Sequence, residues 1–204
     1  MNKLSISSSV LTVIMLSAPS FAGDSGFGVF GAIGQAKHDI DISNDNDIRI
    51  TNDSDTSFAI GGEYRFNSNF TIEVRYDDYG NMTTSPKDEG VTGYNEILAD
   101  SLSAGIKGGI PLSEQFSIFA KIGFSSWDIN TNYSFNYSSL NSTSTESGSL
   151  SESGKDLYYG FGGQYSINEN IVIGLDYTML TIDVDNESPD YDIGNLSLSL
   201  GYNF

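Results

Sequence analysis

Apolar and polar residues alternate along most of this chain, in short segments separated by turn-forming residues. The last segment, "NLSLSLGYNF", places Leu and aromatic residues at every second position, with Ser, Gly and Asn between them. A period of two residues is typical of a β-strand that has one apolar face and one polar face. The pattern therefore predicts a strand that runs to the final residue, Phe204, with an apolar side facing outward.

Seven earlier segments repeat this pattern and bring the expected number of strands to eight. The first is the least regular, because its Gly and Ala residues blur the two faces. Each has roughly 9–12 residues, which is the length of a tilted strand that crosses a membrane. The eight segments are residues 26–37, 57–66, 70–77, 98–110, 116–127, 157–167, 171–180 and 195–204.

The connections between these segments alternate between short and long. Short, turn-rich connections lie at 67–69, 111–115 and 168–170, and long ones at 38–55, 78–96, 128–155 and 181–192. This arrangement is typical of outer-membrane barrels, in which the short turns are periplasmic. We therefore expect an all-β fold, an eight-stranded antiparallel transmembrane β-barrel with short periplasmic turns, long extracellular loops and both termini in the periplasm. The connection 128–155, rich in Ser, Thr and Asn, is expected to be a mobile loop.

A soluble eight-stranded barrel of the lipocalin kind would carry its apolar face inward. Three features count against that alternative. The apolar stripe lacks polar breaks, the opposite face is mostly small or charged, and aromatic residues gather near the strand ends. These features favour an apolar face that contacts lipid.

The first 22 residues have the features of an export signal. Lys3 precedes the apolar run Val10 to Leu16, and Ser20-Phe21-Ala22 has the small residues that a signal peptidase recognises. The apolar run is far shorter than the ~20 residues that a membrane-spanning helix needs. We expect a cleaved signal peptide at 1–22 and a barrel domain at 23–204.

The formal net charge of −18 argues against a nucleic-acid partner, for which a basic surface is expected. The 12 Tyr and 12 Phe are too many for a disordered acidic protein. Most of the acidic residues lie in or beside the four long connections, which predicts solvated acidic loops. "DNDIR" and "DVDNE" lack the Gly and the terminal Glu of a calcium-binding loop, so no metal site is predicted.

Charged residues also occur on the face that is expected to point into the barrel. They are Glu63, Arg65, Glu73, Arg75, Lys107, Lys121 and Asp176. An eight-stranded barrel has room inside for side chains but not for an open aqueous channel, so these charges should pair. We expect Asp176 to contact Lys121 or Arg75, and Glu73 to contact Arg65 or Lys107. We expect these pairs to form a structural plug that satisfies the polar side chains of the lumen.

The end of the chain carries a further expectation. A barrel has no unpaired edge in lipid only if its last strand meets its first. Leu200, Gly201, Tyr202 and Phe204 are similar to the C-terminal strand signal by which the barrel-assembly machinery recognises its substrates. We expect these residues to be an assembly signal.

Four stretches in this order resemble the OmpA-like transmembrane domain family, and the small Ail/OmpX-type adhesion barrels are close in pattern. They are "GGEYRFNSNFTIEVRYDDYG", "LSAGIKGGIPLSEQFSIFAKIGFSSWDINTN", "YYGFGGQYSINENIVIGLDYTML" and "NLSLSLGYNF". The resemblance implies a monomeric barrel embedded in outer-membrane lipid and lipopolysaccharide, with a structural and surface-interaction role toward a host or environmental ligand. It also implies an alternative, a narrow pore gated by the lumen ion pairs. We expect no periplasmic domain after the last strand, and therefore no peptidoglycan anchoring of the kind found in longer relatives.

Catalysis has little support in the sequence. Some outer-membrane barrels modify lipid acyl groups with a His, a Ser and an acid, and here His38 is the only histidine, with Asp39 and Ser43 nearby. Proximity in sequence does not establish the geometry of a triad. We expect no enzyme, no catalytic residues and no cofactor, with a lipid-acyl-modifying enzyme as a remote alternative.

Overall fold

The computed structural model describes residues 25–40, 48–87, 91–139, 142–182 and 191–204. The expected signal peptide, residues 1–22, and Ser43 lie outside the described residues. Within them, no helix is long and apolar enough to cross a membrane. The strands are β1 (Gly26–Ile40), β2 (Ile48–Asn52), β3 (Ser54–Arg65), β4 (Phe70–Pro86), β5 (Val91–Pro111), β6 (Phe116–Ser139), β7 (Ser142–Ser166), β8 (Ile171–Ile182) and β9 (Tyr191–Asn203).

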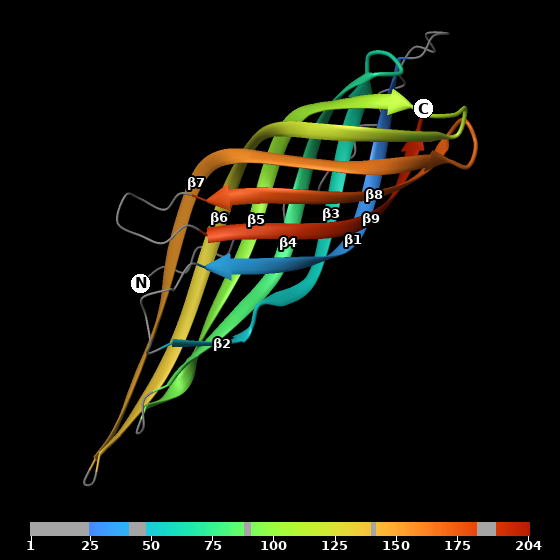
Figure 1. Cartoon of the computed structure of the whole chain (residues 1–204). Coiled ribbons are helices and arrows are strands. Elements are labelled where there is room, and N and C mark those ends of the chain that lie inside the picture. Colours follow the sequence, from blue (N-terminus) through green and yellow to red (C-terminus); the bar gives the residue numbers. More distant parts are fainter. Residues whose placement is uncertain (1–24, 41–47, 88–90, 140–141, 183–190) are drawn as a thin grey trace.

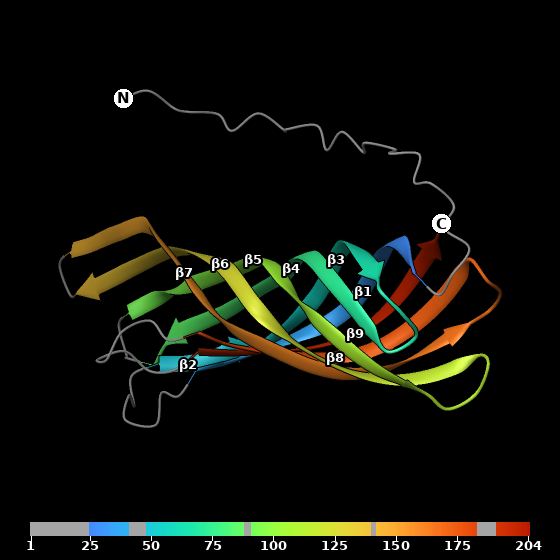
Figure 2. The same ribbon diagram turned by 90° about the horizontal axis from the view of Figure 1, so that it is seen from above.

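Eight of these strands form a closed antiparallel ring (Figures 1 and 2). Each barrel strand pairs with its neighbour in the chain, and β9 pairs with β1 from Gly28↔Asn203 to Ile40↔Tyr191. The prediction of an eight-stranded antiparallel barrel whose last strand meets its first is confirmed. The short β2 lies outside this ring and pairs only with the far part of β4.

Side chains alternate between the lumen and the exterior, as the sequence pattern predicts. Along β4, odd-numbered residues from Thr71 to Tyr79 are buried and the even-numbered residues between them are exposed. Apolar residues of every barrel strand are exposed on the outside, for example Ile60, Leu102 and Leu198 at 53%, 57% and 53% of their surface. Exposed apolar groups on this scale need an apolar surrounding, which a bilayer supplies.

The three short turns lie at one end of the barrel, beside the chain's C-terminus (Figure 1). We call this the turn end, and the opposite end the loop end. Each turn begins with a side-chain oxygen that accepts hydrogen bonds from backbone N–H groups two and three residues later, which is the reason that these short turns close. The accepting residues are Asn67, Ser113 and Asn168.

At the loop end the strands continue far beyond the closed ring. The expectation of a mobile loop at 128–155 is wrong there, because β6 and β7 remain paired from Phe116↔Tyr165 to Ser139↔Ser142 without a register shift. Likewise, β4 and β5 extend through most of 78–96. Figures 1 and 2 show the β6–β7 hairpin as the longest projection at this end. We call the loop-end parts of β4, β5, β6 and β7 the projecting sheet.

Candidate functional sites: the lumen network and the projecting sheet

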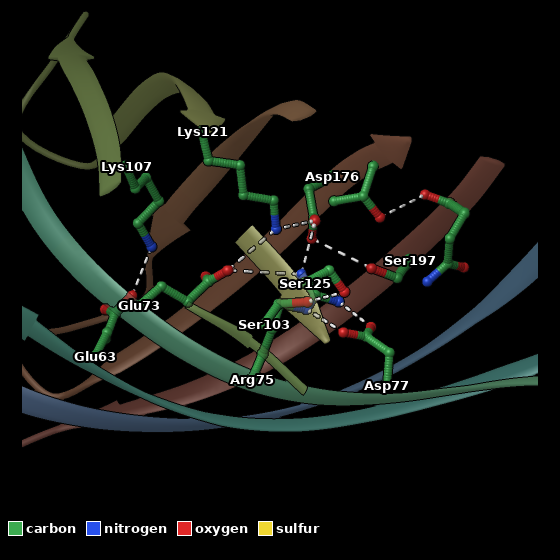
Figure 3. Close-up of polar contacts among 12 residues, drawn as sticks. Glu63, Glu73, Arg75, Asp77, Ser103, Lys107, Lys121, Ser125, Asp176 and Ser197 are labelled. Carbon is green, nitrogen blue, oxygen red and sulfur yellow. Dashed lines mark hydrogen bonds and ion pairs between the residues drawn. The ribbon is translucent and has the colours of Figure 1, made fainter. Parts of the chain in front are cut away.

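Four charged side chains meet in the middle of the lumen (Figure 3). Lys121 Nζ lies 2.7 Å from an oxygen of Asp176 and 3.4 Å from an oxygen of Glu73. Arg75 Nη1 lies 3.4 Å from the same Asp176 oxygen and 3.7 Å from Glu73. All four side chains are at most 8% exposed. Each cation is therefore shared between two carboxylates, which offsets the large cost of removing charges from water.

A fifth residue, Asp77, belongs to this network although it was not among the lumen charges expected from the sequence. Arg75 donates two hydrogen bonds to it, from Nε at 2.7 Å and from Nη2 at 2.5 Å. This two-bond geometry is the strongest arrangement for an arginine and a carboxylate. The two-residue alternation could have predicted that Asp77 points into the lumen, since residue 77 falls on the same face of the strand as Glu73 and Arg75. Its position at the end of the predicted strand, directly before a long connection, had suggested an acid of the loop instead.

A second group of charges lies closer to the turn end. Lys107 donates to Glu63 at 2.5 Å, and Arg65 lies 3.8 Å from the other oxygen of Glu63. The expected contact of Asp176 with Lys121 or Arg75 is confirmed, since Asp176 contacts both cations. The expected contact of Glu73 with Arg65 or Lys107 is wrong, because Glu73 contacts Arg75 and Lys121 instead.

The reason for the difference is the strand register. Lys107 is paired with Thr71 and not with Glu73, so it lies nearer the turn end than Glu73 does. Its amine extends past the Phe119 ring, 5.2 Å from the ring centroid, and reaches Glu63. With Asp77 included, the two groups contain four carboxylates and four cations, each in an ion pair within its own group, so the formal charges of the two groups cancel.

A cavity of about 40 Å³ lies between the two charged groups. Charged residues of both groups line it, together with Phe30, Phe119 and Gln164. A water molecule needs roughly 10–15 Å³ of such space and two or more polar partners. The cavity can therefore hold a few waters that hydrate the charged groups, but it is not a continuous channel.

Above the network, toward the loop end, the lumen becomes first weakly polar and then apolar. Ser103 donates to Ser125 at 2.9 Å, and Ser57 donates to Asn195 at 2.7 Å. Beside and beyond this hydroxyl layer lies a cluster of buried, mostly apolar side chains, of which Tyr158 also reaches Gly105 and Gly123 on the turn-end side. We call these the apolar plug: Ala36, Tyr79, Met82, Ile97, Ala99, Trp127, Ile129, Tyr158, Leu180, Ile182, Tyr191 and Ile193. The sequence did not predict the plug, because most of its members lie in or beside the expected loops.

The lone histidine lies in the wall of the apolar plug and is 1% exposed. Its Nε2 lies 3.0 Å from the Tyr79 carbonyl and donates to it, so Nδ1 accepts from the Tyr191 hydroxyl. Burial lowers the pKa of His38, against the raising effects of the Tyr79 carbonyl and of the Asp55 and Asp53 carboxylates. Both ring nitrogens are thus engaged in structural bonds.

The remote enzymatic alternative gains no support from this geometry. Asp39 follows His38 on β1 and is exposed on the opposite face of the strand. In the described part of the chain, no group of three His, Cys, Asp or Glu residues is placed to hold a metal ion.

The residues of the expected assembly signal are on the seam of the ring. Gly201 pairs with Phe30 of β1, while Leu200, Tyr202 and Phe204 expose 60%, 47% and 69% of their surface on the exterior. Phe204 N donates to the Phe27 carbonyl at 2.9 Å, so the pairing with β1 continues to the last residue.

The projecting sheet has one covered edge and one open edge. Strand β2 pairs with the far part of β4 and covers that edge. At the other edge, β8 pairs with β7 only between Tyr158 and Ser166. Thr181 and Ile182 of β8 still lie opposite residues 157 and 156, so residues 142–155 of β7 have β6 on one side and no described strand on the other.

The lumen-side face of this sheet is aromatic, and glycines lie beneath its rings. A Cβ on Gly148 would lie 2.5 Å from the Tyr133 hydroxyl, and one on Gly154 would lie 2.4 Å from the Trp127 ring. Only glycine lets these rings lie so close to the neighbouring strand. The rings explain why a Ser- and Asn-rich segment forms a hairpin here, since aromatic cross-strand contacts stabilise paired strands.

Comparison with known proteins agrees with this architecture. The family described as outer membrane protein beta-barrel domain matches residues 8–204. No curated protein matches the chain.

Three solved structures are similar over most of their length. Ail, the attachment invasion locus protein of Yersinia pestis, in complex with the heparin analogue sucrose octasulfate, is 18% identical, with 88% of this chain and 99% of that chain covered and a TM-score of 0.50. Neisserial surface protein A is 15% identical, with 88% and 99% covered and a TM-score of 0.52. The outer membrane protein OprG of Pseudomonas aeruginosa is 13% identical, with 89% and 97% covered and a TM-score of 0.52. At these identities the similarity concerns the fold.

Proposed function

This chain belongs to the outer membrane protein β-barrel family, and on that premise we propose that it combines a structural role in the bacterial outer membrane with a surface-interaction role. The apolar exterior holds the barrel in lipid and lipopolysaccharide after export, removal of residues 1–22 and insertion by the barrel-assembly machinery. The turn end and both termini face the periplasm, and the loop end faces the outside. The acidic connections and the projecting sheet are then presented to a host or environmental ligand by a single, monomeric barrel.

The projecting sheet is the observation that carries the interaction role. It extends β6 and β7 far beyond the ring, although closing an eight-stranded barrel does not require that length. Its β7 edge carries backbone groups with no described strand beside them. Natural proteins usually shorten or cover such edges, because they pair readily with other chains. Retaining a long open edge at the loop end fits a surface that binds an extended segment of a partner.

The alternative function, a narrow pore gated by lumen ion pairs, is less well supported by this geometry. Moving Lys121 or Arg75 would open only the layer between the cavity and the hydroxyl layer. The apolar plug would still separate the lumen from the loop end, and an ion that enters an apolar constriction loses its hydration. We expect negligible conductance in planar bilayers for the native protein and for Lys121→Ala. Stable single-channel currents that change in Lys121→Ala would favour the gated pore.

The interaction role is tested by shortening the hairpin. Residues 130–151 are replaced by an Asn-Gly turn, which joins β6 to β7 above the Trp127↔Gly154 pair and keeps the ring intact. Bacteria that produce the native or the shortened barrel at equal surface levels are compared for attachment to host cells and to immobilised matrix proteins. We expect attachment to fall to the level of bacteria that lack the protein. Unchanged attachment of the shortened form would contradict the proposal.

A further inference from the structure

The open edge of β7 has a defined set of backbone groups that face away from β6. Ser166 N donates to the Gln115 carbonyl across the β6–β7 pair, and Ile167 N donates to the Ile171 carbonyl on the other side. The β6–β7 register has no irregularity, so these directions alternate along the whole strand. The residues that present both N–H and C=O to the open edge are Thr145, Ser147, Ser149, Ser151, Ser153 and Lys155.

The side chains beside this edge form an ordered pattern on the lumen-side face. Tyr158 is buried in the lumen and Leu157 is exposed on the exterior, so even-numbered residues of β7 continue the lumen-side face. In order along the edge, this face presents Glu146, Gly148 beneath the Tyr133 ring, Leu150 at 60% exposure, and Glu152. Both glutamates are exposed. The described ion pairs, which lie elsewhere in the chain, do not include either of them.

A strand that adds to this edge would place one side chain beside each of these four residues. Opposite charges that face each other across neighbouring strands are stabilising, and like charges are destabilising. Cations therefore fit beside Glu146 and Glu152, and an aromatic or aliphatic residue fits beside Gly148 and Leu150. The sequence cation–x–apolar–x–apolar–x–cation meets all four positions and reads the same in both directions, so it suits parallel and antiparallel addition.

We propose that the β7 edge binds an extended cationic polypeptide segment with this alternating pattern. The inference rests on the proposed interaction role and names the class of partner. A second copy of this chain would bring the same two glutamates to the contact and add the repulsion of two chains of net charge −18. A sulfated saccharide such as the heparin analogue bound by Ail has no backbone ladder and would meet acidic side chains. Of these three candidates, only a cationic polypeptide both bonds to the open backbone groups of β7 and pairs with Glu146 and Glu152.

The binding test uses the full-length protein purified from outer membranes in detergent micelles. The probes are labelled peptides: Thr-Lys-Thr-Phe-Thr-Val-Thr-Lys-Thr, its version with Glu in place of Lys, and a same-composition version whose two lysines fall on opposite faces. We expect the first to bind most tightly, and more weakly as salt rises. Glu146→Gln with Glu152→Gln should weaken its binding about 2- to 30-fold, from two cross-strand charge pairs. The matched control is Glu169→Gln, which removes one exposed charge at the turn end and should leave binding unchanged.

The edge itself is tested by two further measurements. Ser149→Pro removes an N–H that faces the open edge and no β6–β7 bond, so it should abolish binding of every peptide while the hairpin persists. Hydrogen exchange should show that the bound nine-residue peptide protects the amides of the odd-numbered residues 145–153, since the even-numbered amides are already bonded to β6.

The outcomes separate this inference from the proposed function. If the charge-reversed peptide binds as tightly as the cationic one, or the glutamine variants bind normally, the partner class is wrong and the open edge remains a binding surface. If Ser149→Pro binds normally, the edge is not the site and the inference fails. If the native protein binds no peptide while the shortened hairpin still abolishes attachment, this inference is overturned and the interaction role stands.

Discussion

Replacing Lys121 by Met should destabilise the barrel, because Arg75 would be the one cation left in contact with three buried carboxylates, Glu73, Asp77 and Asp176. Lys121 is 2% exposed and contacts both Asp176 and Glu73. Removing one partner of a buried ion pair costs about 3–5 kcal/mol. Arg75 remains 3.4 Å from Asp176 and 3.7 Å from Glu73, and the cavity beside them can admit water. We therefore expect a loss near the lower limit, about 3 kcal/mol.

The assay is unfolding by denaturant of protein refolded in lipid vesicles. Trp127, the single tryptophan, lies in the apolar plug and reports the loss of the folded barrel by fluorescence. Lys107→Met is the comparison variant: the Lys107–Glu63 pair is more exposed, at 11% and 15%, and Arg65 remains beside Glu63, so the loss of stability should be smaller than in Lys121→Met.

A double-mutant cycle tests the reason for the loss. Adding Asp176→Asn to Lys121→Met removes the orphaned charge, so the double variant should recover part of the lost stability. A coupling energy within about 0.5–3 kcal/mol is expected for residues in one network. Additive losses, or a Lys121→Met variant as stable as the native protein, would refute the view that these charges stabilise the barrel by pairing.

Three further predictions concern the plug and the seam. Burial lowers the pKa of His38, so as pH drops below the ordinary value of 6.5 the histidine of the unfolded chain binds a proton before that of the folded barrel, and the stability of the barrel should fall. Denaturant midpoints measured across this pH range should fall less in His38→Gln than in the native protein. Equal falls would contradict the view that His38 is buried in its neutral form. Gly154→Val should lower stability by about 1–3 kcal/mol and shift Trp127 fluorescence, whereas Gly108→Val, where no atom lies within 4 Å of a Cβ, should do neither. Deleting Phe204 should reduce assembly in the outer membrane without reducing export to the periplasm, measured by fractionation; normal assembly would remove the role given to the C-terminal strand.

The sequence predicted the ring well because a two-residue period is a local property of each strand. Ile60, Leu102 and Leu198 lie outside as the alternation requires, and the β1–β9 contact follows from the need to close the sheet. The partner of Glu73 could not be predicted in the same way. It depends on the stagger between strands and on how far a lysine side chain reaches, and neither is encoded in one segment.

The loop end was harder to predict for a different reason. Its strands contain many Ser, Asn and Thr residues, whose local preference is for turns. The aromatic residues Tyr133 and Phe135 are separated in sequence from their glycine partners, Gly148 and Gly93, so the cross-strand contact is visible only after folding. The apolar plug shows the same effect, since its members come from seven barrel strands.

The seam between β1 and β9 has a consequence for the order in which this protein folds. Its pairs, such as Gly28↔Asn203, join residues from nearly opposite ends of the chain. Forming such a contact before the intervening hairpins would cost about 3 kcal/mol more chain entropy than closing a turn of a few residues. Closure therefore comes last, once the intermediate hairpins have brought the two ends together. Until the seam forms, β1 and β9 each have an unpaired edge and the apolar exterior belongs to an open sheet, which is the kind of intermediate that aggregates in water.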